Sequence, residues 1–481
     1  MRKVFFCLAA LALLFAVDPA HAQSRKAKGK AGRSAGAHKA KSAKAAKKKG
    51  KASKKTAAPA RSYEPPASGV GAFDKVSVIH GDRSGTSALV KNPQALVNLD
   101  NFIRSCISQG AFPGCQVFAA KDGEIIYQKN FGYFSYDRMQ PVTDSSLFDI
   151  ASVTKVAATT LAIMKLYEED KINIDAYLRN YLPFVKGTSK EYITIKDLLL
   201  HQAGLKAFIP FYKKTIDPLT GSPRTDLFHT YPDKTFSVPV AANFYMRNDY
   251  EDSIWEDILT SPMDRGRYVY SDLDFYFLQK VAEAVSGTTL EPYVQTNFYK
   301  PLNLKYTMYN PWKRNLTRQC VPTENDKYFR FQHIQGYVHD PGTSMLGGVA
   351  GHAGIFSNVR DLSVIMQMLL NGGVYKGQRY LQKETVQLFT GYRSTISRRA
   401  YGFDKPEKAR GDGGPASDDC TKTTFGHQGF TGTCAWADPE TGIIFIFLSN
   451  RINPSADNQL INSLKVRVKA QSYIYEALGY E

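Results

Sequence analysis

A serine and a lysine that could act together stand three residues apart: Ser152 and Lys155 form the single Ser-x-x-Lys motif of the chain. Apolar residues recur at helical spacing after them, which predicts a helix that begins at the motif. Residues three apart share a helix face, so the amine and the hydroxyl are expected to be neighbours. A buried lysine whose pKa is lowered by desolvation can remove the serine proton. Ser152 is therefore a candidate nucleophile with Lys155 as its base.

A second candidate element is Tyr270-Ser-Asp272, which precedes another apolar run. A tyrosine beside a nucleophile can relay protons if nearby cations lower its pKa. Asp272 could hold Lys155 in place through charge-assisted hydrogen bonds. The same spacing recurs at Tyr250-Glu-Asp252, so the pattern is weak when it stands alone.

The third candidate element is Gly426-His-Gln-Gly-Phe-Thr-Gly432, at the start of a run that reads as a buried strand. Gly429 would let a substrate approach the backbone closely. The Phe430 N–H could then join the Ser152 N–H in an oxyanion hole. His427 could orient the substrate or assist proton transfer.

A competing histidine lies at His352-Ala-Gly354, inside the glycine-rich run that begins at Gly347. It precedes a helix-like segment, and no strand is predicted that would place it beside a serine. We therefore prefer His427 over His352 as the histidine of the site.

The order of these motifs resembles the serine β-lactamase and penicillin-binding protein superfamily, in its class C-like branch. The resemblance covers about residue 110 to the C-terminus. Three further segments also resemble this branch: Leu198-Leu-Leu-His-Gln-Ala-Gly-Leu205, Gly347–Gly354 and Leu448-Ser-Asn-Arg451.

The resemblance implies that Ser152 is acylated, that Lys155 and Tyr270 handle its proton, and that Tyr270 helps to activate the deacylating water. Two departures bear on the substrate. Asp272 stands where the branch often has asparagine, which adds negative charge beside Lys155 and favours a raised lysine pKa. His427 stands where β-lactamases and many carboxypeptidases have lysine, and a mostly neutral imidazole suits a substrate carboxylate less well. The chain therefore resembles the peptidase and esterase members more than a dedicated β-lactamase.

The pattern of elements predicts an α/β fold, which the resemblance makes β-lactamase/transpeptidase-like: an antiparallel sheet flanked by helices, with an inserted all-α subdomain. A hairpin is expected around Asp122-Gly123. Residues 208–250 are expected to be a loop within the insertion. The other expected elements are helices over 95–107, 194–303 and 460–478, and strands over 424–437 and 443–449.

The beginning of the chain predicts export and a separate basic segment. Residues 1–22 read as a signal peptide with a charged start, a short apolar stretch and Ala20-His-Ala22 before the cut. Residues 23–75 form a Lys/Ala-rich linker that is expected to be disordered, followed by one hydrolase domain over 76–481. Residues 25–61 hold 15 of the 62 lysines and arginines and no acid, so most of the net charge of +18 sits there. We expect periplasmic or extracellular location.

The basic residues 25–61 indicate no specific partner. They could bind an anionic cell-envelope polymer through counterion release, or serve only as a solvated tether. No specific nucleic acid, transmembrane segment, metal or organic cofactor is implied. Five cysteines remain after the signal peptide, and their spacing fits no zinc site and selects no disulfide.

Together these features favour an exported serine hydrolase that works through an acyl-enzyme on a small amide or ester. The preferred substrate is a cell-wall peptide containing D-amino acids, as for a D-Ala-D-Ala carboxypeptidase. The alternatives are a class C-like β-lactamase, a carboxylesterase whose acyl pocket uses residues 208–250, and a silent wall-binding or sensor protein.

Overall fold

The computed structural model describes residues 76–81 and 87–480, with the exception of 408, 410 and 412. The predicted signal peptide (1–22) and the whole of the predicted basic linker (23–75) lie outside the described residues. Their boundaries therefore stay predictions.

A five-stranded antiparallel sheet carries the site at one edge, with the strand order β11-β12-β13-β1-β2. The predicted hairpin around Asp122-Gly123 is confirmed as β1 and β2. The predicted strand over 424–437 is two strands, because the chain turns at residues 430–432. The strands are β1 (Gly114–Lys121), β2 (Glu124–Gly132), β11 (Phe425–Gly429), β12 (Thr433–Asp438) and β13 (Ile443–Ser449).

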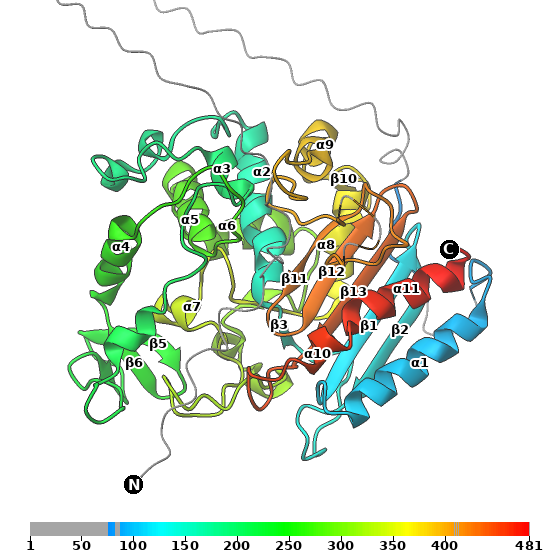
Figure 1. Cartoon of the computed structure of the whole chain (residues 1–481), viewed down its shortest axis with the longest axis horizontal. Helices are drawn as coiled ribbons and strands as arrows, with labels where there is room; N and C mark the ends of the chain where they lie inside the picture. The colour runs from blue at the N-terminus through cyan, green and yellow to red at the C-terminus, as the bar shows by residue number, and fades with distance from the viewer. Residues whose placement is uncertain (1–75, 82–86, 408, 410, 412, 481) are drawn as a thin grey trace, which may run out of the picture. The chain divides into compact units, whose positions relative to one another are not determined.

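Helices cover both faces of this sheet (Figure 1). The first and last helices, α1 (Pro93–Ser108) and α11 (Val466–Leu478), lie together over one face, and α8 (Val359–Leu370) packs on the other. The predicted helix over 460–478 is interrupted, because Lys465 adopts a left-handed conformation with φ of 53° between α10 (Leu460–Ser463) and α11.

The central strand β13 explains why both faces need a cover. Its side chains alternate, as strand geometry requires. Ile443, Phe445 and Phe447 join the core under α1 and α11. Ile444, Ile446 and Leu448 join the core that continues into the helical half of the protein. A strand that is apolar on both faces is stable only as the middle of a three-layer arrangement.

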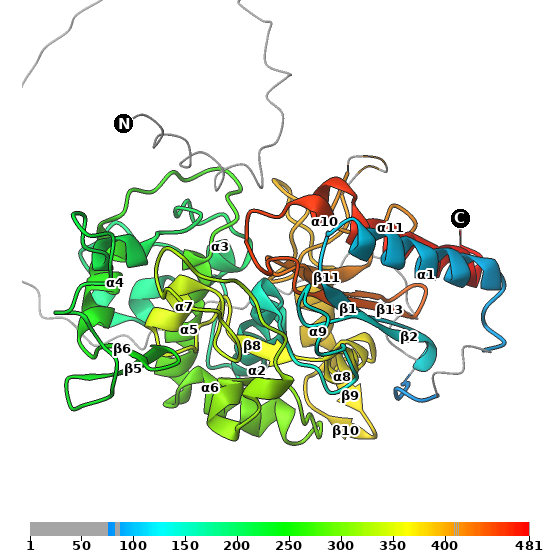
Figure 2. The ribbon, with the colours of Figure 1, turned by 90° about the horizontal axis from the view of Figure 1, so that it is seen from below.

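The segment between β2 and β11 forms the helical half, seen beside the sheet in Figure 2. This confirms the predicted fold class. The helices of this half and of its return to the sheet are α2 (Thr160–Glu168), α3 (Ile195–Leu199), α4 (Tyr250–Thr260), α5 (Leu273–Ser286), α6 (Leu290–Val294), α7 (Pro341–Met345) and α9 (Lys383–Gly391).

The insertion is not entirely helical, which corrects one part of the expectation. Residues 208–250, predicted as a loop, carry a three-stranded sheet in which Phe228 stacks on Phe244 with ring centroids 4.5 Å apart. The remaining strands are short: β3 (Phe148–Asp149), β4 (Phe228–His229), β5 (Phe236–Ala241), β6 (Phe244–Arg247), β7 (Met308–Tyr309), β8 (Ile355–Ser357), β9 (Val374–Tyr375) and β10 (Gln378–Arg379).

Within the described part of the chain, no helix combines the length and the apolar character that a membrane crossing needs. The cysteines 106, 115, 320, 420 and 434 are all free thiols.

Helix α2 is the central support of the site, and its packing gives a stability prediction. Leu161 is 0% exposed. We expect Leu161→Ala to lower the free energy of unfolding by about 2–5 kcal/mol, because it removes buried methyl groups and leaves a cavity. Denaturant unfolding measures this change. Leu219→Ala is the matched control, since Leu219 is 94% exposed. Equal losses in the two variants would contradict the described core.

Candidate active site

The segment around Ser152 is less regular than the predicted helix. Strand β3 leads into a 3₁₀ turn (Ala151–Val153), followed by a π-helical turn (Lys155–Thr159), and regular helix begins only at Thr160. Ala151 has a φ of 45°, which is uncommon for a residue with a side chain, and its N–H donates to Asp149 Oδ1 at 2.9 Å. In a 3₁₀ turn residues three apart are aligned, so the predicted neighbourhood of Ser152 and Lys155 survives the correction.

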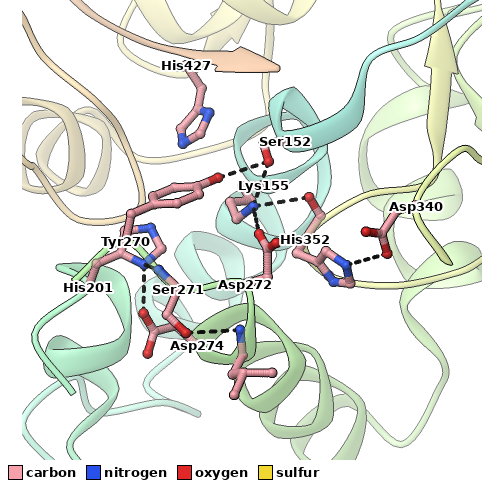
Figure 3. Close-up of polar contacts among 12 residues, drawn as sticks. Ser152, Lys155, His201, Tyr270, Ser271, Asp272, Asp274, Asp340, His352 and His427 are labelled. Atoms are coloured by element: carbon pink, nitrogen blue, oxygen red, sulfur yellow. Dashed lines mark hydrogen bonds and ion pairs between the residues drawn. The ribbon is translucent and has the colours of Figure 1, made fainter. Parts of the chain in front are cut away.

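Ser152 Oγ accepts hydrogen bonds from two of the predicted site residues (Figure 3). Lys155 Nζ donates at 2.8 Å, and Tyr270 Oη donates at 2.9 Å. Lys155 follows Ser152 in the same segment, whereas Tyr270 lies three residues before the start of α5. The hydroxyl oxygen therefore sits where two donors converge.

The Lys155 ammonium is fully buried and has three hydrogen-bond acceptors. Besides Ser152, it donates to Asp272 Oδ1 at 2.7 Å and to the His352 carbonyl oxygen at 3.3 Å. Burial alone would lower the pKa of Lys155, but the Asp272 carboxylate outweighs it and raises this pKa above its usual value. The expected contact with Asp272 is confirmed. The ion pair favours a charged Lys155 in the resting site, and the expected role of Lys155 as the base stays a prediction.

The Tyr270 phenol is neutral in this arrangement. Burial raises its pKa above the usual value, and the opposing effects of Lys155 and Arg399 do not cancel this, because Asp272 also raises it. The condition placed on Tyr270, a pKa lowered by cations, is therefore not met in the resting site. Lys155 Nζ lies 4.9 Å from the centre of the tyrosine ring and Arg399 Cζ lies 5.0 Å from it, so two cations are in place to stabilise a phenolate once it forms.

The third predicted motif lies on the edge strand β11, where His427 is 3% exposed. Its Nδ1 lies 2.6 Å from the Gln428 carbonyl oxygen, and its Nε2 lies 3.0 Å from Arg399 Nη1. The ring centre is 5.9 Å from that of Tyr270. Burial, then the Arg399 and Lys155 cations, hold the pKa of His427 well below its usual value.

The lack of a side chain at Gly429 lets this chain's own backbone approach closely, and the expected approach of a substrate stays a prediction. A Cβ at Gly429 would lie 2.5 Å from the Ile150 carbonyl oxygen and 2.1 Å from Thr433 Oγ1. The same carbonyl accepts a hydrogen bond from Thr433 Oγ1 at 3.0 Å. The end of β11 is thereby held against the segment that leads into Ser152. Phe430, the next residue, keeps 37% of its surface exposed.

The histidine that sequence reasoning set aside also reaches the site, through its main chain. His352 precedes β8, which pairs with β3, and β3 leads directly to Ser152. This pairing supplies the strand that was not predicted. The His352 ring points the other way, where its Nε2 lies 2.9 Å from Asp340 Oδ1.

A buried histidine and carboxyl behind Tyr270 were also missed. His201 Nδ1 lies 2.6 Å from Asp274 Oδ2, and both side chains are 1% exposed. The Ser271 N–H donates to the same nitrogen at 3.2 Å. Burial raises the pKa of Asp274 well above its usual value, which favours a protonated carboxyl group beside His201.

Among the described residues, no cluster of three or more His, Cys, Asp or Glu side chains is arranged to hold a metal ion.

The comparisons with known proteins agree with this geometry. The family model described as Beta-lactamase matches residues 99–468. A relative from Salmonella gallinarum, named "Putative D-alanyl-D-alanine carboxypeptidase", is 31% identical over 398 residues, which cover 77% of this chain and 85% of that protein. The chain belongs to the beta-lactamase family. It is a serine hydrolase of that family.

Solved structures of the family share the fold. EstCE1, described as a hydrolase with promiscuous acyltransferase activity, has a TM-score of 0.57 at 19% identity, covering 79% of this chain and 99% of that one. A class C beta-lactamase from Rhodobacter sphaeroides has a TM-score of 0.56 at 17% identity, covering 79% and 99%. At these identities the similarity describes the architecture alone.

The Lys155–Asp272 ion pair gives a prediction about pH. Asp272 raises the pKa values of both Lys155 and Tyr270. Asp272→Asn should therefore lower both, so that the deprotonated form of the site is populated at lower pH. We expect the part of the profile in which kcat/KM rises with pH to move to lower pH. The matched control is Asp252→Asn, at the exposed copy of the same Tyr-x-Asp spacing. A rise that stays in place or moves to higher pH in Asp272→Asn would contradict the ion pair.

The packing of Gly429 gives a second prediction. Gly429→Ala should cost about 1–3 kcal/mol of stability and slow acylation, because the added methyl group must push β11 away from Ile150. Thermal unfolding and the rate of active-site labelling measure the two effects. Gly391→Ala serves as control, because a Cβ there meets no atom within 4 Å. Unchanged labelling in Gly429→Ala would show that this contact does not position Ser152.

Proposed function

We propose that the protein is an exported hydrolase in which Ser152 forms an acyl-enzyme with a cell-wall peptide containing D-amino acids. The observation that carries this proposal is the convergence of Lys155 and Tyr270 on Ser152 Oγ, at 2.8 and 2.9 Å. A serine between a fixed cation and a phenol is suited to nucleophilic attack on an amide or ester carbonyl.

The protonation states of Lys155 and Tyr270 suggest different roles for these two neighbours of Ser152. Lys155 is kept charged by Asp272, so it stabilises negative charge on Ser152 Oγ rather than taking its proton. Tyr270 is the group that can accept that proton, in the fraction of molecules in which it is a phenolate between the Lys155 and Arg399 cations. As Oγ bonds to the carbonyl carbon, Tyr270 takes the serine proton and then gives it to the leaving amine or alcohol. The same tyrosine can next draw a proton from the water that cleaves the acyl-enzyme.

The negative charge that develops on the carbonyl oxygen needs separate donors. We assign these to the backbone N–H groups of Ser152 and Phe430, as the motif order suggests. The packing of Gly429 against Ile150 supports this role, since it holds the end of β11 next to the nucleophile segment.

The substrate class rests on family membership and on the third motif. The Salmonella relative bears a D-alanyl-D-alanine carboxypeptidase name and aligns over 85% of its length. His427 replaces the lysine of β-lactamases and many carboxypeptidases, and its pKa lies well below the usual value. This departure favours a peptidase or an esterase over a dedicated β-lactamase, and the choice of the peptide substrate rests on the name of the Salmonella relative.

A carboxylesterase is the second candidate, and the same histidine favours it. Arg399 is only 2% exposed and bonds His427, so the positive charge near the third motif is covered by a neutral ring. A substrate that carries no carboxylate would fit such a surface. Comparative turnover separates the two candidates.

Export remains part of the proposal. The signal-like residues 1–22 would deliver the enzyme to the periplasm or beyond, where the basic residues 25–61 could hold it near anionic envelope polymers. These segments lie outside the described residues.

The test is turnover by the purified mature chain of a D-Ala-D-Ala peptide, an acyl ester and a cephalosporin. We expect release of D-Ala, and a loss of about three orders of magnitude or more in Ser152→Ala, because the nucleophile is removed. Ser105→Ala is the control, since Ser105 is exposed on α1.

Three outcomes would change the assignment. Exclusive turnover of the ester would favour the carboxylesterase, and rapid turnover of the cephalosporin would favour a β-lactamase. Hydrolysis that persists in folded Ser152→Ala would remove Ser152 from the mechanism altogether.

A further inference from the structure

A buried arginine lies behind the third motif and belongs to none of the motifs identified from the sequence. Arg399 sits in the segment between α9 and β11 and is 2% exposed. The segment is anchored on both sides. Asp404 pairs with Gly426 of β11 through two backbone hydrogen bonds of 2.8 and 3.0 Å, and the Gly402 N–H donates to the Leu199 carbonyl oxygen at 2.9 Å. The position of Arg399 is thus set by the sheet edge and by α3.

The guanidinium contacts two side chains that border Ser152. Its Nη1 lies 3.0 Å from His427 Nε2, and its central carbon lies 5.0 Å from the centre of the Tyr270 ring. Its remaining contacts fix its orientation: Nε donates to Tyr268 Oη at 3.2 Å, and Nη2 lies 3.4 Å from Asp404 Oδ2. Arg399 therefore acts on the site through other residues.

These contacts determine the tautomer of His427. A guanidinium can only donate hydrogen bonds, so Nε2 must offer its lone pair to Arg399. The Gln428 carbonyl oxygen can only accept, so Nδ1 must carry the proton that lies toward it, across 2.6 Å. With both nitrogens engaged, the imidazole is neutral and has no proton to exchange with a substrate.

We propose that Arg399 is a positioning residue of this active site, which fixes His427 in its neutral Nδ1–H form and places a permanent positive charge against the Tyr270 ring. The second role rests on the proposed function, because it matters only if Tyr270 handles the proton of Ser152. An arginine suits this task because it remains charged at every pH at which the enzyme is folded. The family's lysine at the third motif is in effect replaced by two residues, a neutral ring and a cation behind it.

The charges around Tyr270 and His427 determine what loss of Arg399 should do. The cations are Lys155 and Arg399, the carboxylates are Asp272 and Asp404, and His201 is a neutral ring 4.6 Å from that of Tyr270. Removing Arg399 leaves Lys155 as the one facing cation among these groups. The phenolate of Tyr270 then forms at higher pH, so acylation at neutral pH slows.

The test combines spectroscopy of the imidazole with a pH profile, using Arg399→Gln and Arg399→Lys in the full mature chain. Nitrogen-15 NMR of histidine-labelled protein, with His427→Gln to assign the signal, should show the Nδ1–H tautomer and no titration between pH 5 and 8. In Arg399→Gln the signal should become a tautomer mixture that titrates. In Arg399→Gln the acylation rate at pH 7 should fall about tenfold or more, and the rise of this rate with pH should move to higher pH. Arg399→Lys should recover part of the loss.

The matched control is Arg398→Gln. Arg398 is the adjacent guanidinium and bonds the same Asp404 at 2.6 Å, but it pairs with Glu407 rather than His427. We expect its His427 signal and pH profile to match the wild type. An identical signal and profile in Arg399→Gln, or equal changes in the two variants, would overturn the proposal.

Two further outcomes keep the proposal separable from folding and from the proposed function. If Arg399→Gln does not fold, the wild-type spectrum decides: an Nε2–H tautomer, or a His427 that titrates near pH 6.5, overturns the proposal without any variant. If Ser152→Ala retains hydrolysis, the proposed function fails, while the tautomer measurement still tests Arg399 on its own.

Discussion

The Lys155 ammonium is the constraint on which the site depends. A charge with no exposed surface is stable only if it is paired and hydrogen-bonded, because desolvation costs it several kcal/mol. Here the partners come from three segments that are far apart in the chain. Ser152 lies one turn before Lys155, Asp272 lies at the start of α5, and the His352 carbonyl lies before β8. Satisfying one buried cation thus brings the nucleophile, the tyrosine motif and the glycine-rich loop to one point.

That same constraint changes the chemistry expected of the lysine. A lysine that is paired this closely with a carboxylate does not lose its proton easily, so we propose that the acid–base role passes to Tyr270. The phenol then needs nearby positive charge to act as a base, and Lys155 and Arg399 supply it on the ring. Asp272 opposes the influence of both cations, because its negative charge raises the pKa of Tyr270. The site therefore balances two cations against one carboxylate around a tyrosine, and the pH at which it works follows from that balance.

The sequence predicts the parts of this molecule that have a local signature. The Ser152 motif, the hairpin around Asp122-Gly123 and the apolar run of β13 are visible because their pattern follows helix or strand geometry. The Tyr270 motif is weak by itself and is recognised through the order of the three motifs that resembles the family. The two strands of 424–437 were joined in error, since the turn after Gly429 interrupts a run that is buried throughout. The turns around Ser152 also differ from a simple helix, because Asp149 and the left-handed Ala151 impose a local geometry that no periodicity reports.

What could not be predicted comes from groups without a pattern of their own. The His352 carbonyl is a main-chain atom, and every residue has one, so only the pairing of β3 with β8 reveals its role. Arg399 lies in a segment of irregular structure 28 residues before His427, and nothing in its spacing indicates the contact. The pairing of His201 with Asp274 joins residues 73 positions apart. Each is a tertiary contact, and tertiary contacts decide the protonation states that the motifs leave open.

The central claim is that Ser152 is the nucleophile of this hydrolase. It is tested most directly by labelling the folded mature chain with a fluorophosphonate probe and locating the adduct by peptide mass mapping, with Ser152→Ala in parallel. The account predicts one adduct, on the peptide that contains Ser152, and none in the variant. Absence of an adduct on the folded wild type, or an adduct that persists in Ser152→Ala, would contradict it.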